Sequence, residues 1–346
     1  MHIVGLGAVS ALGHGIDTLR ELYNLAPMLP GKFAQEGALS DTVFYQGLLT
    51  EEQARSAWYL ANEAITEALG KTKAEFNNIA LIIATGAGDT KALEITKCAQ
   101  YERYNLAQKL ATEHGLKGLY LTVSNACSSS GYALPIAQKL LAQGHDAVVV
   151  CGVEAKSDSS QMAFKAMMAL DDHSCRPFQA SRNGTVLGAG AAALVLTHHT
   201  HVKHYAYIQK TTLNCDGYHV TAPNPEGKTL AKCLDHLMTE YTVSPCDVGL
   251  FLPHATGTQL NDGIEHALLK RVFPDTFTPD KTVCLKQWIG HTGGASAAFS
   301  YLSAALHLSG RFQVAKTNLA RCALVNSTAF GGHNCMSFMT VNKEAS

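Results

Sequence analysis

Several short apolar runs in this sequence do not alternate with polar residues, and they restrict its fold more than any other feature. The runs lie at residues 79–85, 147–152, 191–196, 248–252 and 322–326. A strand with apolar side chains on both faces has to be covered on both faces, as in sheets that lie between layers of helices. The sequence therefore predicts buried strands in a layered protein.

Helical patterns separate these runs. One covers residues 51–69 and starts with Thr50 and Gln53, which fit a capping box; another covers residues 130–143 and ends at Gly144. Strands that alternate with helices are typical of an α/β protein. A histidine-rich polar stretch follows one predicted strand and precedes another at residues 205–209. We therefore expect two parts, residues 1–200 and 201–346, with a boundary near residue 200.

Composition restricts partners and location. Apolar residues make up 47% of the chain and charged residues 16%, against about 25% charged in an average domain, which favours an oligomer with a covered surface. Lysine and arginine (27) almost balance aspartate and glutamate (28), so we expect no nucleic-acid partner. The ten cysteines include no Cys-x-x-Cys pair, which indicates reduced thiols. We expect a cytoplasmic protein, because the sequence shows no cationic leader and no membrane span.

Two motifs resemble ligand-binding sequences, but we predict a ligand at neither. Residues 5–10 resemble a dinucleotide fingerprint, but Ser10 stands where the third glycine belongs, so we predict a tight strand-to-helix turn without NAD. Residues 198–204 contain four histidines and no nearby cysteine or carboxylate, which favours a solvated connection over a zinc site. We accordingly predict neither a metal nor a nucleotide cofactor.

Cys127 is the first candidate for a chemical role. It lies in the segment Ser-Asn-Ala-Cys-Ser-Ser-Ser-Gly, directly before an apolar-striped helix. A helix N-terminus favours thiolate over thiol through its dipole and free N–H groups, and small neighbours leave room for a substrate. From its position alone, Cys127 fits a nucleophile and a buried structural cysteine equally well.

Two histidines follow in the second half. His254 comes after the apolar run at 248–252, at the carboxyl end of a predicted strand, where α/β proteins bind ligands. Thr256 and Thr258 follow it and offer hydroxyl groups. Lys286 and His291 precede a run of small residues that begins another helix. A single histidine is more often structural, but this set, together with a cysteine at a helix start, predicts an active site.

The order of these motifs resembles the β-ketoacyl-acyl-carrier-protein synthases, condensing enzymes of the thiolase superfamily. The matching landmarks are Asn-Ala-Cys-Ser-Ser-Ser-Gly at 125–131, residues 176–188, residues 216–221, the two histidine motifs and residues 326–332. The resemblance implies an α/β, thiolase-like fold with five layers, α-β-α-β-α, made from two similar halves with the active site between them.

The resemblance also implies roles for individual residues. Cys127 would take an acyl chain from a carrier-protein thioester, and a malonyl extender would lose carbon dioxide and attack that acyl group. His254 and His291 would donate hydrogen bonds to the thioester oxygen of the extender. The backbone N–H groups of Cys127 and Phe330 would bind the acyl oxygen, and Phe330 would gate the acyl pocket.

The remaining implied roles concern support and binding. Lys286 would organise the site electrostatically, with Asp262 and Glu265 as its buried partners. The substrates would be carried on the phosphopantetheine of an acyl carrier protein, with no other cofactor, and the chain would form a homodimer or a heterodimer with another ketosynthase-like subunit. The pantetheine arm would lie against three threonines, Thr221, Thr256 and Thr258.

The sequence departs from the family pattern at five positions. The glycine expected after the first histidine is Ala255, and the glutamates expected at two further positions are Ala189 and Ser300. The C-terminal glycine turn is preceded by Thr328 and Ala329. An added methyl group can crowd a substrate pocket, and each lost carboxylate removes a candidate partner of Lys286.

Two main functions follow from this pattern. The first is an active condensing enzyme (an acyltransferase) of fatty acid or type II polyketide-like synthesis, with a histidine motif that leans toward the aryl polyene branch. The second is a chain-length-factor-like subunit that does not elongate and shapes the cavity of a partner ketosynthase. The retained cysteine, lysine and two histidines favour catalysis. A thiol hydrolase using Cys127 and one histidine explains fewer of the landmarks.

Overall fold

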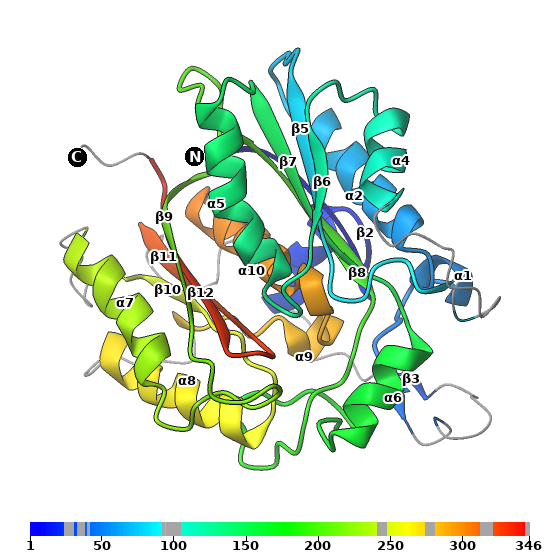
Figure 1. Ribbon diagram of the computed structural model, residues 1–346, viewed down its shortest axis with the longest axis vertical. Helices are drawn as coiled ribbons and strands as arrows, with labels where there is room; N and C mark the ends of the chain where they lie inside the picture. Colours follow the sequence, from blue (N-terminus) through cyan, green and yellow to red (C-terminus); the bar gives the residue numbers. More distant parts are fainter. Residues whose placement is uncertain are drawn as a thin grey trace.

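The computed structural model describes residues 1–23, 31–32, 39, 42–91, 94, 105–240, 248–273, 281–311 and 321–342. In these residues one mixed sheet contains most of the strands, in the order β10-β11-β12-β9-β1-β8-β7-β5-β6. Among the described residues, the two sections of the sheet meet only where β1 pairs with β9, through His2 with Tyr207 and Ile3 with Ala206. This narrow junction lets the two sections diverge and enclose helices between them (Figure 1).

The first section is built from β1, β5, β6, β7 and β8, in which β5, β6 and β7 are parallel and β8 is antiparallel to its neighbours. Nearly every residue of β5, β7 and β8 is buried, which confirms the prediction of strands covered on both faces. The bounds are β1 (His2–Ser10), β5 (Ile79–Ala84), β6 (Tyr120–Val123), β7 (Ala147–Glu154) and β8 (Gly190–Thr197).

The second section has the strand order β9-β12-β11-β10. β11 runs parallel to β10 and antiparallel to β12. The predicted boundary near residue 200 falls in the connection from β8 to β9, and the division into two domains stays a prediction. The bounds are β9 (Ala206–Cys215), β10 (Leu250–Leu252), β11 (Cys322–Ala329) and β12 (His333–Thr340).

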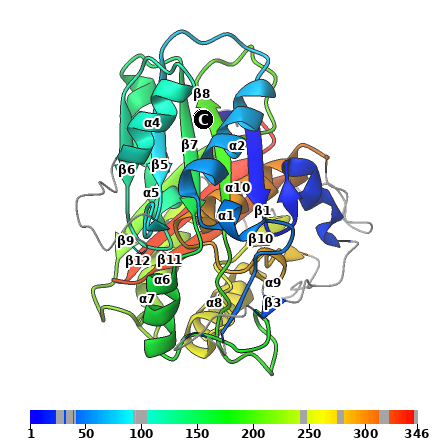
Figure 2. The same cartoon turned by 90° about the vertical axis from the view of Figure 1, so that its right-hand side faces the viewer.

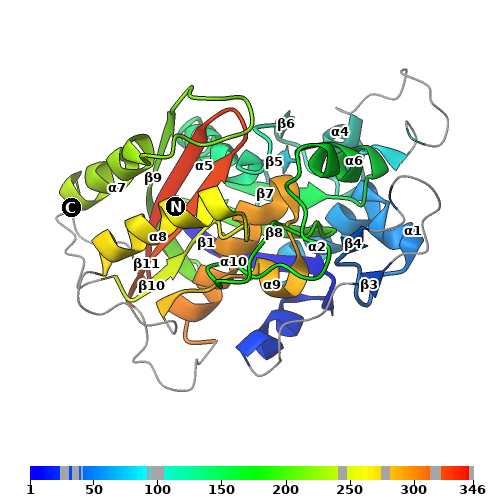
Figure 3. The ribbon, with the colours of Figure 1, turned by 90° about the horizontal axis from the view of Figure 1, so that it is seen from below.

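Helices complete five layers, as expected. α2 (Ala57–Gly70) and α4 (Asn105–Glu113) cover the outer face of the first section (Figure 2). α5 (Ser129–Ala142) and α10 (Ser296–Leu308) lie between the two sections, and every residue of α10 is buried. α7 (Lys228–Glu240) and α8 (Gln259–Val272) cover the outer face of the second section (Figure 3). The result is the predicted α-β-α-β-α arrangement.

Shorter elements connect these layers. The connecting elements are β2 (Gly13–His14), η1 (Ile16–Tyr23), β3 (Gly31–Lys32), β4 (Val43–Phe44), α1 (Glu51–Ala54), α6 (Asp158–Ala166), α9 (Lys286–Ile289) and η5 (Gly293–Ala295).

Every helix within the described ranges is too short or too polar to cross a membrane.

The prediction of one continuous helix over residues 51–69 is wrong. Thr50 and Gln53 form the predicted capping box, but α1 ends after one turn. Ser56 then adopts an extended conformation, and its side chain accepts a hydrogen bond from the N–H of Tyr59. Ser56 is therefore the N-cap of a second helix, α2, because its hydroxyl satisfies a free donor of the new first turn.

The turn predicted at residues 5–10 is also wrong, because these residues lie inside β1. A Cβ atom on Gly7 would lie 2.0 Å from the carbonyl oxygen of Ala64, and one on Gly5 would lie 2.3 Å from that of Ala68. The glycines are thus required for the close approach of α2 to the strand rather than for a turn or a nucleotide.

The N-termini of the two central helices meet. Ser130 donates a hydrogen bond to the carbonyl of Gly294 at 2.7 Å and accepts one from the N–H of Ala298 at 2.9 Å. α5 begins two residues after Cys127 and α10 begins five residues after His291. This contact therefore brings the cysteine and the second histidine side by side, although they are far apart in the sequence.

Candidate active site

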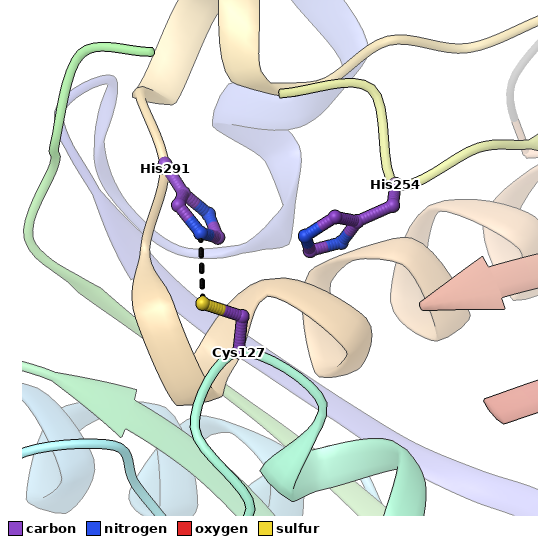
Figure 4. Close-up of side chains that lie close together, drawn as sticks. All are labelled: Cys127, His254 and His291. Atoms are coloured by element: carbon purple, nitrogen blue, oxygen red, sulfur yellow. Dashed lines mark hydrogen bonds between the residues drawn. The ribbon is translucent and has the colours of Figure 1, made fainter. Parts of the chain in front are cut away.

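Three predicted catalytic side chains converge from separate segments: Cys127 before α5, His254 after β10 and His291 after α9 (Figure 4). The Nε2 atom of His291 lies 3.0 Å from the Sγ atom of Cys127. The rings of His254 and His291 are 5.3 Å apart and nearly perpendicular. All three side chains are buried. The structure thus brings the predicted cysteine and both predicted histidines together, and their catalytic roles stay predictions.

A strained turn presents the cysteine. Ala126 has φ of 46°, a left-handed conformation that costs a non-glycine residue about 1–2 kcal/mol. Ser129 stabilises the turn, because its hydroxyl accepts a hydrogen bond from the N–H of Asn125 at 2.9 Å and donates one to the carbonyl of Ala126 at 2.6 Å. The thiol of Cys127 is consequently held at one position next to the histidines.

The resting charge of Cys127 differs from the prediction. Burial raises the pKa of the thiol to about 12, and the positive charge of Lys286 only partly opposes this effect. Cys127 is only 7% exposed. The effect of burial on its pKa is therefore larger than the opposite effect of the helix N-terminus, and the resting form is the thiol. A thiol needs a base to become a nucleophile, and Nε2 of His291 is placed to accept its proton.

This raised pKa predicts how Cys127 reacts with a small alkylating agent. Because only the thiolate reacts, the rate of iodoacetamide labelling at Cys127 should rise about tenfold for each unit between pH 7 and pH 9. Labelling is measured on the Cys127 peptide by mass spectrometry. A rate that levels off near neutral pH would show a thiolate at rest and contradict this result.

Both histidines are neutral. Burial, assisted by the charge of Lys286, holds the pKa of His254 and His291 well below the ordinary value. Nδ1 of His291 pairs with the hydroxyl of Ser296 at 3.0 Å, which orients the ring so that Nε2 faces the thiol. In the described part of the chain, no group forms a hydrogen bond with the ring nitrogens of His254. His254 can therefore donate a hydrogen bond to a ligand.

Lys286 lies at the site, where burial lowers its pKa and the charge of Glu265 partly opposes this effect. Its side chain is 6% exposed, and its ammonium donates a hydrogen bond to the carbonyl of His254. No ion pair within 4.0 Å joins it to Asp262, Glu265 or another carboxylate among the described residues. The ammonium acts on the site through its charge, which lowers the pKa of Cys127 and of both histidines.

The two carboxylates instead hold the loop that carries His254. Glu265 accepts hydrogen bonds from the N–H groups of His254 and Ala255, both at 2.6 Å. Asp262 accepts one from the N–H of Gly257 at 3.1 Å. Ala255 and Gly257 both have left-handed φ angles, so this backbone needs external support. Asp262 and Glu265 are positioning residues for His254.

Replacing Glu265 with glutamine should therefore destabilise the fold. The side-chain amides of Asn261 and Asn326 also donate to Glu265, at 2.9 and 2.7 Å, and a glutamine NH₂ would oppose two of these donors. We expect Glu265→Gln to lower the free energy of unfolding by about 1–3 kcal/mol, measured by urea denaturation. Glu226→Gln, at an exposed ion pair with Lys228, should change it by less than about 1 kcal/mol. Equal effects would contradict the assigned role.

Two pockets, each of about 250 Å³, meet at Cys127. The first, called the threonine pocket, is lined by His254 and by all three predicted substrate-binding residues, Thr221, Thr256 and Thr258. The second pocket is mainly apolar. Its walls include Phe44, Glu154, Ala155, Ser160, Ala163 and Leu187. Five residues line both pockets: Cys127, Phe164, Met167, His291 and Phe330.

Sequence analysis missed several residues of this site. Phe164 and Met167 form the wall between the two pockets together with Phe330, and nothing in the local sequence distinguishes them from other apolar residues. Ser296 lies in the run of small residues that begins a helix after His291. Its hydroxyl, about one turn after the histidine, is the sequence signal that could have indicated a partner for the ring. Glu154 accepts backbone N–H groups from both halves.

The departures from the family pattern have different consequences. Ala189 packs in the core under α2 and lines neither pocket. Ser300 donates a hydrogen bond within its own helix, to the carbonyl of Ser296, so it does not compensate the charge of Lys286. Thr328 donates to the side chain of Asn261 at 3.0 Å, and Ala329 lines the threonine pocket. The left-handed backbone of Ala255 is stabilised by the hydrogen bond from its N–H to Glu265.

Comparison with known proteins gives a consistent assignment. Residues 31–201 match the family model of the beta-ketoacyl synthase N-terminal domain, and residues 205–320 match that of the C-terminal domain. A relative, 3-oxoacyl-[acyl-carrier-protein] synthase 2 of Mycobacterium tuberculosis, is 26% identical over 321 residues, which cover 78% of this chain and 76% of that protein. Together the two domain models match most of the chain.

Solved structures have the same fold. A type II polyketide ketosynthase, bound to the hexaketide and in complex with its acyl-carrier protein, has a TM-score of 0.83 with 20% identity over 99% of both chains. A complex of a ketosynthase with its chain length factor from Xenorhabdus doucetiae gives a TM-score of 0.78 with 23% identity, over 99% of this chain and 98% of that one. From its sequence matches and its thiolase-like fold, the chain belongs to the β-ketoacyl synthase family.

Proposed function

We propose that this chain catalyses the decarboxylative Claisen condensation of an acyl thioester, held on Cys127, with a malonyl group on an acyl carrier protein. The observation that carries the proposal is the contact of 3.0 Å between the Cys127 thiol and a neutral His291, at the point where two pockets meet. The reaction would serve fatty acid or type II polyketide-like synthesis and needs no cofactor beyond the carrier's phosphopantetheine.

The first step is acyl transfer to the cysteine. His291 accepts the thiol proton, and the Cys127 thiolate attacks the carbonyl carbon of the acyl thioester. The bond from that carbon to the carrier's sulfur breaks, and the released thiolate takes up the proton. In this proposal the carrier arm lies along the hydroxyls of the threonine pocket and the acyl chain enters the apolar second pocket.

The second step makes the new carbon–carbon bond. The malonyl carboxylate leaves as carbon dioxide, and its electron pair forms the enolate of the remaining acetyl thioester. His254 donates a hydrogen bond to the enolate oxygen from its neutral imidazole, and His291 donates a second one in the tautomer that carries its proton on Nε2, in which Nδ1 accepts from Ser296. The enolate carbon then attacks the acyl carbonyl, and the sulfur of Cys127 leaves as a thiolate. The N–H groups of Cys127 and Phe330 bind the oxyanion of this attack.

The proposal is tested by intact-protein mass spectrometry. The chain is exposed to acyl carrier protein that bears an acyl group and is then chased with malonyl carrier protein. An acyl adduct that disappears as β-ketoacyl product forms is the expected result. Release of free acid instead would indicate a thiol hydrolase and contradict the condensing function.

A second candidate function is a chain-length-factor-like partner subunit. The burial of Cys127, which raises the pKa of its thiol to about 12, favours it, because little of the thiolate that takes up an acyl group is present at neutral pH. The fold is also shared with a ketosynthase in complex with its chain length factor. The outcome that supports this function is a folded chain that takes up no acyl group by itself.

An exposed sheet edge supports a dimer in either case. β6 is the edge strand of the first section, and Leu119 and Tyr120 at its start are 50% and 45% exposed. An edge strand with exposed apolar side chains is suited to pairing with another subunit. We propose that β6 joins this chain to a second ketosynthase-like subunit, identical or different. A cytoplasmic location stays a prediction from the sequence.

This interface predicts a change of mass in solution. The double variant Leu119→Lys with Tyr120→Lys places charges at the edge and should weaken self-association at least tenfold, about 1.4 kcal/mol. Light scattering after size exclusion measures the mass. Leu48→Lys, at a residue that is 75% exposed and away from the edge, should leave the mass unchanged. A double variant that stays dimeric would exclude β6 as the interface.

A further inference from the structure

The catalytic residues contain a second possible chemistry, which the condensing reaction does not use. Cys127, His254 and His291 form the one group of three or more His, Cys, Asp or Glu side chains, among the described residues, whose ligand atoms are close enough for a single ion. These three atoms all lie within 4.8 Å of one another. One sulfur and two imidazole nitrogens are a donor set that borderline-soft divalent cations prefer.

We propose that Cys127, His254 and His291 together form a reversible binding site for Zn²⁺, which blocks the cysteine and inhibits acyl transfer. The inference goes beyond the condensing function, because it concerns metal binding by the resting chain. Figure 4 shows that the two rings approach the sulfur from different directions. An ion between the three side chains would contact each of them on one side.

The distances are close to those of a zinc site. With Zn–N of about 2.0–2.1 Å and Zn–S of about 2.3 Å, ligand atoms around tetrahedral zinc lie about 3.3–3.6 Å apart. The Nε2 atom of His291 is 3.0 Å from the sulfur, and the widest separation in the group is at most 4.8 Å. Movements of about 1 Å or less, through side-chain torsions, would bring the three atoms to zinc geometry.

The protonation states and hydrogen bonds also fit. Binding follows a balanced exchange in which the Cys127 thiol loses its proton to solvent and Zn²⁺ binds the resulting thiolate and two neutral imidazoles. The bond from Nδ1 of His291 to Ser296 already fixes the nitrogen that faces the sulfur. Lys286 opposes the added charge, and the new thiolate offsets part of this repulsion. The threonine pocket borders all three side chains, so an ion has access and a fourth position stays open.

The histidine-rich connection at residues 198–204 is the obvious competitor, and the geometry argues against it. Its four histidines do not assemble into a group of three ligands among the described residues. The rings of His199 and His201 lie 5.4 Å apart with His199 stacked beside Phe76. This tract offers at most a weak surface site, and its variants serve as the matched control.

The first experiment measures Zn²⁺ binding to the full chain by equilibrium dialysis, with Mg²⁺ as a hard-cation control. We expect one tightly bound equivalent of Zn²⁺ per chain and no comparable binding of Mg²⁺. Cys127→Ala and His254→Ala should each weaken Zn²⁺ binding at least tenfold, while His199→Ala with His201→Ala should leave it unchanged. Tight binding by Cys127→Ala, or its loss in the double control variant, would overturn the proposal.

The second experiment needs no variant, so a folding defect cannot affect it. Iodoacetamide labelling of the Cys127 peptide is followed with and without one equivalent of Zn²⁺. We expect at least tenfold slower labelling with Zn²⁺ and full recovery after EDTA, whereas labelling of the exposed Cys215 should not change. Equal labelling of Cys127 in both conditions would overturn the proposal. Neither readout depends on condensing activity, so the proposed function and the zinc site can fail separately.

Discussion

Cys127→Ala is expected to abolish acyl loading while the fold stays intact. The sulfur belongs to the one thiol that borders both pockets among the described residues, and it lies 3.0 Å from the base that activates it. Alanine removes this atom without adding volume, and the turn at Ala126 and Ser129 is held by hydrogen bonds that do not involve the thiol. The mass of the chain after exposure to acyl carrier protein should therefore not increase, and its melting temperature should change little.

The matched control is a cysteine that lines neither pocket. Cys215 is exposed, and its thiol contacts the carbonyl of Gly331, a contact that the hydroxyl of Cys215→Ser can retain. This variant should load the acyl group as the unchanged chain does. An adduct of the same mass on Cys127→Ala would mean that another residue is the nucleophile.

The two histidines are expected to fail at different steps. His254→Ala should still load the acyl group, because His254 forms no hydrogen bond with the thiol of Cys127. It should then lose condensation by a factor of about 10²–10³, since it removes one donor from the developing enolate oxygen. His291→Ala should slow loading as well, because it removes the nitrogen that accepts the thiol proton.

The rates of adduct formation and of β-ketoacyl product formation separate these effects in one experiment. Ser296→Ala is a third variant, which leaves both rings in place and removes only the partner of Nδ1 of His291. It should slow loading less than His291→Ala does. Normal condensation by His254→Ala would remove the role assigned to His254, and equal loading by both histidine variants would remove the role of His291 as the base.

Much of the fold followed from sequence patterns because they are local. Apolar runs such as residues 147–152 are strands that are covered on both faces, and the pattern alone states this. The end of α5 was also predicted from the sequence, because a glycine, Gly144, follows the helical pattern. In the structure Gly144 has φ of 96°. The cysteine and histidine motifs were found because each lies at an element's end, where side chains meet at the edge of a layer.

Partners could not be assigned in the same way. Glu265 was expected to pair with Lys286. Its carboxylate instead accepts hydrogen bonds from backbone N–H groups of the His254 loop. Phe164 and Met167 form a pocket wall that no motif indicates. Within residues 51–69 a single residue, Ser56, decided between one helix and two.

The sequence by itself predicted the layered α/β fold and singled out Cys127, His254 and His291 as candidates for the site. Only the tertiary structure decided that the thiol of Cys127 is protonated at rest, that Lys286 forms no ion pair with a carboxylate among the described residues, and that two pockets meet at the sulfur. The physical reason is that hydrophobic periodicity and helix ends depend on neighbours in the chain. Desolvation, hydrogen-bond partners and cavities depend on which segments, far apart in sequence, come to lie within a few ångströms of one another.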